Sequence, residues 1–370
     1  MFLSSINLRN IRKHANNRID FTNHINYIIG GNGVGKTSVL EAIYYLTTTK
    51  SCVTSSDSET VKMGEVDFAI QGFFDGKTED SVQVIYSKLD NKKTYILNNK
   101  HINKFSEIIG KFPVVLLSPA DHAITQGFSS DRRRFIDSVM SQASKTYLSI
   151  LIEYNKTLKH RSVLLNRIRE NKQRENEELE AWNEKMIKTG TEIIKHRINF
   201  INEYEVYVKQ SYQKILSEKE NPGIYYYYLE DTGGENLENN FARLLEQRAA
   251  EELRRGANLV GPHRDDFVFE INKLNLKRYG SQGQHKTFQT ILRFAEYYYL
   301  KDKKETTPIF LLDDVFGELD TERARAISQN LSELSQTIIT LTDFTNISYL
   351  KKRNDDRAIM LSANSEVSYV

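Results

Sequence analysis

A glycine-rich stretch near the N-terminus constrains this chain more than any other feature. The apolar run at residues 26–29 leads into residues 30–37, GGNGVGKT, which match the pattern G-x-x-x-x-G-K-[S/T]. In such a loop, backbone N–H groups surround a phosphate, the lysine supplies a positive charge, and the last hydroxyl ligates Mg²⁺. The residues expected to contact the nucleotide are Gly30, Gly31, Asn32, Gly33, Val34, Gly35, Lys36, Thr37 and Ser38.

The residues on both sides of this loop support the interpretation. Residues 38–44 favour a helix, whose N-terminal dipole would face the phosphates. A glycine-rich turn in a chain of this length would match the pattern by accident about once in a hundred cases. A strand before and a helix after make the accident rarer. We therefore predict binding of ATP or a similar triphosphate together with Mg²⁺.

Composition leaves the choice of partner open. The 51 basic and 49 acidic residues give a net charge of +2, so any surface for nucleic acid must be local. A single cysteine, Cys52, excludes an internal disulfide and suits a reducing compartment. No run approaches the roughly 18 apolar residues of a membrane span, so we expect no membrane partner and a cytoplasmic location.

A β-rich part surrounds the glycine-rich loop. Alternating or apolar runs predict strands at 2–8, 18–21, 25–29, 67–74, 81–88, 93–97 and 112–117. Arg9, Arg12 and Lys13 lie near the first turn and could reach a nucleotide or DNA, but a solvated loop explains them equally well.

Three arginines mark the start of the central part. Asp131 can cap a helix whose first turn carries Arg132, Arg133 and Arg134, where cations are unfavourable. Either a bound anion such as DNA or ion pairs with nearby carboxylates could compensate. The chain to about residue 217 is almost free of glycine and proline, which predicts an arm of two antiparallel helices, each about 35 residues or ~50 Å long.

Polar motifs return after the arm. Residues 261–266, GPHRDD, lack the spacing of a zinc site, so we expect a turn that directs polar groups towards the nucleotide or DNA. Strands are predicted at 225–229 and 267–271, around a helix at 237–255. Ser281, Gly283 and Gln284 then open an amphipathic helix at 288–300.

An apolar strand at 308–312 ends in Asp313 and Asp314, and another strand is predicted at 337–341. With a phosphate loop present, Asp313 is placed to meet the Mg²⁺ held by Thr37, and Asp314 to orient or deprotonate the attacking water. The alternative is that both aspartates only cap the following turn. Lys36 and Asp314 are the predicted catalytic residues.

The order of these motifs resembles ABC-type ATPases of the SMC and Rad50 kind. The resemblance implies an α/β fold: an ABC-type P-loop ATPase head with an inserted α-helical arm. We expect head segments at 1–130 and 221–370 and the arm at 131–220. It also implies an ATP-dependent homodimer in which one copy's signature contacts the other copy's ATP. The residues concerned are Ser281, Gly283, Gln284 and, in the D-loop, Asp320.

Within that group, the chain resembles the RecF family of bacterial recombination mediators. The matching motifs are residues 32–37 with 40–43, 118–121, 132–137, 261–266 and 311–315. This resemblance implies a weak DNA-dependent ATPase that clamps duplex DNA at gaps, in repair and replication restart. It further implies RecR, RecO and RecA as partners, and a nucleoid location.

Two departures from the family pattern stand out. Ser51-Cys52-Val53 replaces the usual Ser-Phe-Arg, and Thr342-Asp343 stands where ABC ATPases carry a histidine, a lack that RecF proteins share. The missing γ-phosphate contact suggests slow hydrolysis. An ATP-gated nuclease and a transporter subunit remain alternatives. Only about 50 residues follow Asp314, which is small for a cleavage domain, and the missing histidine and the long arm argue against a transporter.

Overall fold

The computed structural model describes residues 1–171, 176–215, 220–231, 236–316, 321–343, 354–362 and 366–369. The chain divides into two compact units. We call residues 1–121, 210–218 and 286–370 the head unit, and residues 122–209 and 219–285 the arm unit. This division differs from the predicted one, because residues 122–130 and 221–285 group with the arm and residues 210–218 group with the head.

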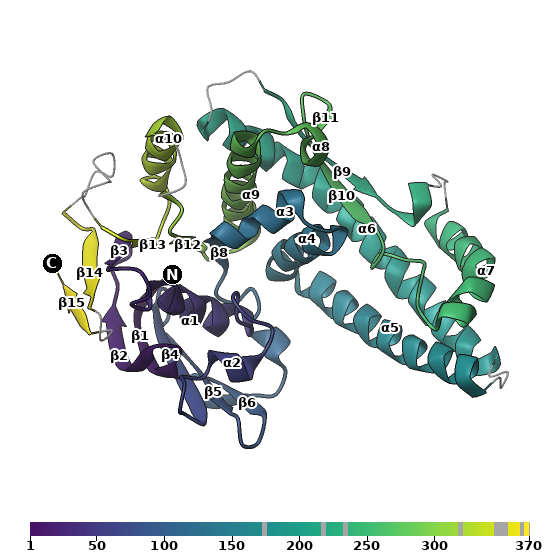
Figure 1. Cartoon of the computed structure of the whole chain (residues 1–370), viewed down its shortest axis with the longest axis horizontal. Helices are drawn as coiled ribbons and strands as arrows, with labels where there is room; N and C mark the ends of the chain where they lie inside the picture. The colour runs from purple at the N-terminus through teal and green to yellow at the C-terminus, as the bar shows by residue number, and fades with distance from the viewer. Residues whose placement is uncertain are drawn as a thin grey trace. The chain divides into compact units, whose positions relative to one another are not determined.

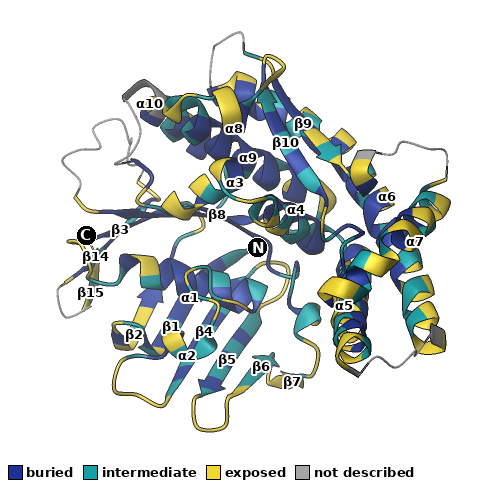
Figure 2. Ribbon diagram, turned by 45° about the vertical axis from the view of Figure 1, so that its right-hand side comes forward, coloured by how far each residue is buried: buried dark blue, intermediate teal, exposed yellow. Residues whose placement is uncertain are grey.

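A mainly parallel sheet carries the nucleotide motifs in the head unit. Its order is β15-β14-β3-β13-β12-β8, and only β15 runs antiparallel to its neighbour. The central strands β3 and β13 are fully buried and mostly apolar, as expected for strands covered on both faces (Figure 2). The bounds are β3 Ile25–Ile29, β8 Val114–Leu117, β12 Ile309–Asp313, β13 Thr337–Leu341, β14 Arg357–Leu361 and β15 Val367–Tyr369.

An antiparallel sheet forms the second layer of the head unit, in the order β2-β1-β4-β5-β6-β7. Its burial alternates residue by residue, so one face packs inward and the other meets solvent. The bounds are β1 Phe2–Ile11, β2 His14–Asp20, β4 Asp67–Asp75, β5 Asp80–Ser87, β6 Lys92–Leu97 and β7 Lys100–Ile102.

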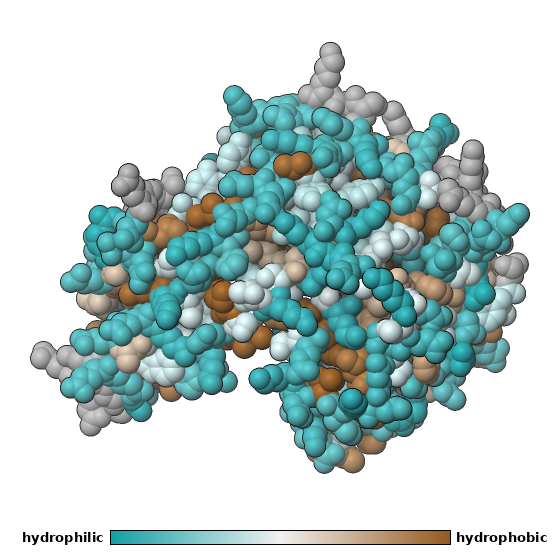
Figure 3. Space-filling model, turned by 180° about the vertical axis from the view of Figure 1, so that it is seen from behind, coloured by the Kyte–Doolittle hydropathy of each residue, from teal (hydrophilic) through white to brown (hydrophobic). Residues whose placement is uncertain are grey.

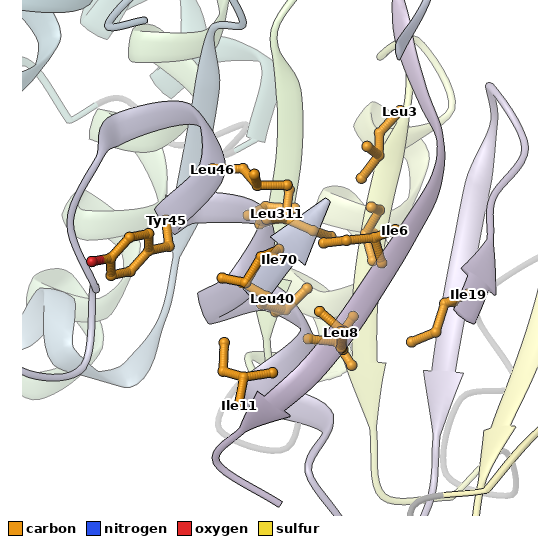
Figure 4. Packing of buried hydrophobic residues seen from close by; sticks show 14 of the residues in the cluster. Leu3, Ile6, Leu8, Ile11, Ile19, Leu40, Tyr45, Leu46, Ile70 and Leu311 are labelled. Atoms are coloured by element: carbon orange, nitrogen blue, oxygen red, sulfur yellow. The ribbon is translucent and has the colours of Figure 1, made fainter. Parts of the chain in front are cut away.

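Helix α1 (Lys36–Thr48) contacts strands of both sheets and fills the head core (Figure 1). Figure 4 shows Leu40 of α1 beside Leu8 of β1 and Ile70 of β4, with Leu311 of β12 close by. Each of these side chains is at most 1% exposed, and each such burial contributes about 1.5–3 kcal/mol. The packing therefore fixes the helix that follows the glycine-rich loop. The head unit also contains α2 Asp57–Thr60, α10 Thr321–Leu331 and, from residue 286 on, α9 Gln282–Lys303.

The arm unit combines long helices with a three-stranded sheet, in the order β11-β10-β9. Helices α5 and α6 lie antiparallel, because Lys185 pairs with Glu153 while Glu178 pairs with Arg167. Ser144 adopts an extended conformation and separates α4 from α5, so the stretch holds three helices where two were predicted. The bounds are α3 His122–Gln126, α4 Ser129–Ala143, α5 Lys145–Asn171, α6 Asn176–Ile215, α7 Leu237–Arg255, α8 Leu276–Tyr279, β9 Pro222–Tyr227, β10 Asp266–Ile271 and β11 Leu274–Asn275. The residues of α6 from 210 on group with the head unit.

Hydrophilic side chains cover most of the face shown in Figure 3, where apolar ones form separate patches. Among the described residues, no helix has both the length and the apolar character that a membrane crossing requires.

Candidate nucleotide site

The loop after β3 has the backbone that its glycines permit. Gly35 has φ 106° and precedes the first residue of α1, and a Cβ there would lie 2.8 Å from Nε2 of His14. A Cβ on Gly30 would lie 2.5 Å from the carbonyl oxygen of Leu361. Larger residues would therefore strain or displace the loop. Residues 31–33 are exposed, so the loop is open to solvent.

Lys36 curls over its own loop. Its Nζ donates to the carbonyl oxygens of Gly30 at 2.7 Å and Gly31 at 2.9 Å, and the residue is only 8% exposed. Burial lowers the pKa of Lys36, while the negative charges of Asp314 and Asp313 oppose that shift. The ammonium group thus lies beside the loop that the sequence assigns to phosphates.

Asp313 and Thr37 meet as the sequence predicted. Thr37 Oγ1 donates to Asp313 Oδ1 at 3.0 Å, and Thr340 Oγ1 donates to the same oxygen at 2.8 Å. Burial raises the pKa of Asp313, and the neighbouring charge of Asp314 adds to the rise, whereas the two hydroxyl groups lower it. A hydroxyl and a carboxylate about 3 Å apart suit a hard cation such as Mg²⁺, which prefers oxygen ligands.

Asp314 has an uncommon backbone conformation. Its φ is 48°, in the left-handed region, and its N–H donates to Thr340 Oγ1 at 2.9 Å. A non-glycine residue held there by its surroundings is strained, and such residues concentrate at functional sites. The conformation fits the role assigned to Asp314 in the sequence analysis.

The hairpin turn between β1 and β2 contacts the same loop. Arg12 forms two 2.8 Å hydrogen bonds with the buried carboxylate of Glu41 on α1, and Ser51 Oγ donates to that carboxylate at 2.5 Å. The bidentate bond raises the pKa of Arg12. Arg12 is thus held by α1, and Ser51 of the unusual Ser51-Cys52-Val53 segment takes part in the same cluster.

His14 is a site residue that the sequence analysis missed. It is fully buried, and its Nε2 donates to the carbonyl oxygen of Gly35 at 3.0 Å. Lys13, next to it, places Nζ 3.4 Å from where a Cβ on Gly33 would lie. The turn therefore braces the loop from outside. A lone histidine followed by polar residues carries no recognisable signal in the sequence.

The signature residues lie in the arm unit, at the start of α9. Ser281 N–H donates to Gln284 Oε1 at 2.9 Å, and Gln284 N–H donates to Ser281 Oγ at 3.2 Å. This reciprocal pair is a capping box. Ser281 is exposed and Gly283 half-buried, so the helix N-terminus is accessible. Asp320, the predicted D-loop residue, lies outside the described residues.

Of the three candidate DNA-binding arginines, Arg132 is buried, Arg133 is half-buried and Arg134 is exposed. Arg132 is 6% exposed and forms a bidentate pair with Asp266 at 2.8 and 2.9 Å. Arg133 donates to the carbonyl oxygen of Asp265 at 2.5 Å, and burial lowers its pKa. Arg134 has an 81% exposed side chain. The structure therefore favours ion pairing over an anion contact for Arg132 and leaves Arg134 as the accessible candidate.

The GPHRDD turn also differs from expectation, because its polar groups are engaged within the arm unit. Asp265 is 5% exposed and accepts a hydrogen bond from Tyr226 Oη. His263 accepts from Tyr154 Oη at 2.8 Å through Nδ1 and donates to the carbonyl oxygen of Asn258 at 3.2 Å through Nε2. Burial lowers the pKa of His263 to about 4. The turn organises the arm's interior.

The described residues contain no group of three or more histidine, cysteine or carboxylate side chains that could hold a metal ion.

Comparisons with known proteins agree with this geometry. The family model for the RecF/RecN/SMC N terminal domain matches residues 2–352. A DNA replication and repair protein RecF from Chloroherpeton thalassium is 38% identical over 95% of this chain and 98% of its own length. A structure of the recombination mediator protein RecF with ATP, from the RecFOR pathway, is 28% identical with a TM-score of 0.90, and the match covers 100% of this chain and 97% of that one.

The wider fold class is confirmed by an SMC head bound to the C-terminal winged-helix domain of ScpA. Its TM-score is 0.56 at 14% identity, and the match covers 100% of this chain and 98% of that one. The head fold is thus the one shared by SMC-type ABC ATPases, as predicted. Taken with the sequence match over almost its whole length, this shows that the chain belongs to the RecF family of DNA replication and repair proteins.

Proposed function

We propose that this protein is a DNA-binding recombination mediator in which ATP binding joins two copies into a clamp. The observation that carries the proposal is the meeting of Thr37 and Asp313 at the open end of the phosphate loop, with Lys36 beside them. These groups form one side of an ATP site. The exposed loop at residues 31–33 leaves room for a second copy to complete the other side.

The residues of the nucleotide site have separate roles in binding and hydrolysing ATP. Lys36 exchanges its two carbonyl acceptors for the β- and γ-phosphates, and Asp314 orients or deprotonates the attacking water. Thr37 and Asp313 would hold a Mg²⁺ ion, which would supply positive charge to the phosphates. Ser281 of the second copy, with backbone N–H groups of Gly283 and Gln284, contacts the γ-phosphate because a helix N-terminus attracts anions. Hydrolysis is slow, and it releases the clamp.

The protein binds DNA mainly through contacts to its phosphates. Such binding is nearly independent of sequence and weakens steeply with salt. Arg134 is the accessible candidate contact from the original set of three. Because related proteins are named for DNA replication and repair and for the RecFOR pathway, we also propose RecR, RecO and RecA as partners and gapped duplex as the substrate.

The test is the molar mass of the Asp314→Asn protein with ATP and Mg²⁺, with and without gapped duplex, at low salt. This substitution should keep ATP bound while hydrolysis stalls, so dimers carrying DNA should accumulate. Lys36→Ala should abolish the dimer by removing ATP binding, and Ser281→Arg should abolish it while ATP still binds. A monomer that ignores ATP in the Asp314→Asn protein would refute the shared-site mechanism.

A further inference from the structure

A groove on the arm unit is lined by several positively charged side chains. It lies between α5 and the first turns of α6, has a volume of about 500 Å³, and falls within the usual 300–1,000 Å³ range of ligand pockets. The residues that matter in its lining are Lys156, Lys159, His160, Val163, Arg167 and Glu178. None belongs to the nucleotide site.

The charges in this groove favour an anionic occupant. Lys156 and Lys159 are exposed, and neither has an ion-pair partner among the residues the structure describes. The single carboxylate in the lining, Glu178, is 2.7 Å from Arg167 and is neutralised by it. Two lysines are therefore left to attract negative charge.

The groove also offers apolar and aromatic surface. Val163 is 62% exposed, which is high for a valine on a helix that packs against a neighbour. Beside it, the ring of His160 stacks on that of Trp182, with centroids 4.9 Å apart and planes 2° apart. An occupant can thus combine carboxylates with at least one apolar side chain.

We propose that this groove binds an acidic segment of a partner protein, with a carboxylate on Lys156 and Lys159 and an apolar side chain against Val163. Nucleic acid fits less well, because the neighbouring turns of α6 expose Glu177, Glu180 and Glu184. A phosphate backbone carries charge continuously along its length and would be repelled there. A short peptide places its few charges only where the lysines lie.

Helix geometry sets the spacing of the expected segment. Val163 follows Lys156 by seven residues, which corresponds to about 10 Å along α5. An extended peptide advances about 3.3 Å per residue. The apolar side chain should therefore come about three residues after the carboxylate.

The sequence Glu-Ser-Ser-Leu-Ser-Ser has this spacing and serves as the probe. Trp182 is the only tryptophan of the chain and stacks on a groove residue, so its fluorescence reports occupancy directly. Titration of the full-length protein should give a saturable fluorescence change. Peptides with glutamine for the glutamate, or serine for the leucine, should bind at least tenfold more weakly.

Charge-reversal variants test whether the peptide binds in the groove. Lys156→Glu combined with Lys159→Glu should weaken binding of the probe at least tenfold, while Lys188→Glu, also exposed on the arm but ten residues beyond Glu178 on α6, should leave it unchanged. ATP binding should be the same in all three proteins, so failure here is distinct from failure of the clamp. No fluorescence change, equal loss in both variants, or tighter binding of a short single-stranded oligonucleotide than of the probe would overturn the proposal.

Discussion

The nucleotide site and the interior of the arm use the same kinds of side chain in opposite ways. At the end of β3, Thr37 and the loop at residues 31–33 are exposed and can take up a ligand. In the arm, Arg197 is 2% exposed and its guanidinium meets Asp137 at 2.8 Å, with Asp265 a further neighbour at 3.7 Å. The polar groups of the nucleotide site are accessible to a ligand, whereas the charged groups of the arm pair with one another in its interior. Charged motifs in a sequence do not distinguish the two.

The largest effect should come from breaking the arm's charge network. Arg197→Met leaves Asp137 and Asp265 without their shared cation, and loss of one member of a buried pair costs on the order of 3–5 kcal/mol. Urea unfolding should show a loss of that size. Arg134→Met, at an 81% exposed side chain, is the control and should change the free energy of unfolding by less than about 0.5 kcal/mol. Equal effects would remove the contrast between network and surface.

Lys36→Ala should instead weaken ATP binding and leave the stability of the fold nearly unchanged. The loss of the phosphate cation should weaken ATP binding about a hundredfold, or roughly 3 kcal/mol. The unfolding free energy without nucleotide should change by about 1 kcal/mol or less, because only hydrogen bonds to two loop carbonyls are lost. Equilibrium binding of a fluorescent ATP analogue, beside urea unfolding, measures both. A large stability loss with little change in affinity would place Lys36 with the structural charges instead.

His263 gives the arm a pH dependence that its glutamine variant should lack. Its pKa is lowered to about 4, below the usual value near 6.5, so the unfolded chain binds the proton more readily. Stability from this group is therefore present above pH 6.5 and falls as the pH drops towards 4. Between pH 7 and pH 5 the loss should be about 2 kcal/mol.

The control for that pH dependence is His263→Gln, whose amide can still accept from Tyr154 and donate to Asn258. The difference in unfolding free energy between the two proteins, followed across the same pH range, isolates the histidine. A parallel pH profile in both proteins would contradict the assignment.

Replacing His14 should have a smaller effect on ATP affinity, because the side chain only positions the phosphate loop. His14→Ala removes the donor to the Gly35 carbonyl, which should weaken ATP binding about tenfold, near 1.4 kcal/mol. His14→Gln keeps an N–H donor and should restore most of the affinity. If alanine and glutamine weaken binding equally while both proteins stay folded, the hydrogen bond to Gly35 does not position the loop.

Periodicity and loop chemistry were enough to predict much of the head. β3 and β13 have the bounds expected from their apolar runs, and Thr37 and Asp313 meet as their motifs required. These features depend on local patterns, which a sequence displays directly. Helix α7, at Leu237–Arg255, also has the predicted bounds, and in the structure Asn236 caps its start and Gly256 ends it.

The features that the sequence did not predict depend mainly on contacts between residues far apart in the chain. Arg132 finds its partner at Asp266, and Arg197 at Asp137, pairings that no local pattern encodes. The break between α4 and α5 at Ser144 involves neither glycine nor proline, so the sequence gives no sign of it. His14 belongs to the site only because a hairpin turn packs against Gly35.

The strand order of the parallel sheet has a consequence for synthesis on the ribosome. β3 emerges among the first thirty residues, but its two neighbours in the sheet, β13 and β14, are made only after residue 336. Until then both edges of β3 lack their native partners, and exposed apolar edges invite wrong pairing. Asp313 also meets Thr37 only when β13 has joined their strands. The nascent chain thus carries a complete phosphate-loop motif long before it can assemble the site, and ATP can stabilise the fold only near the end of translation.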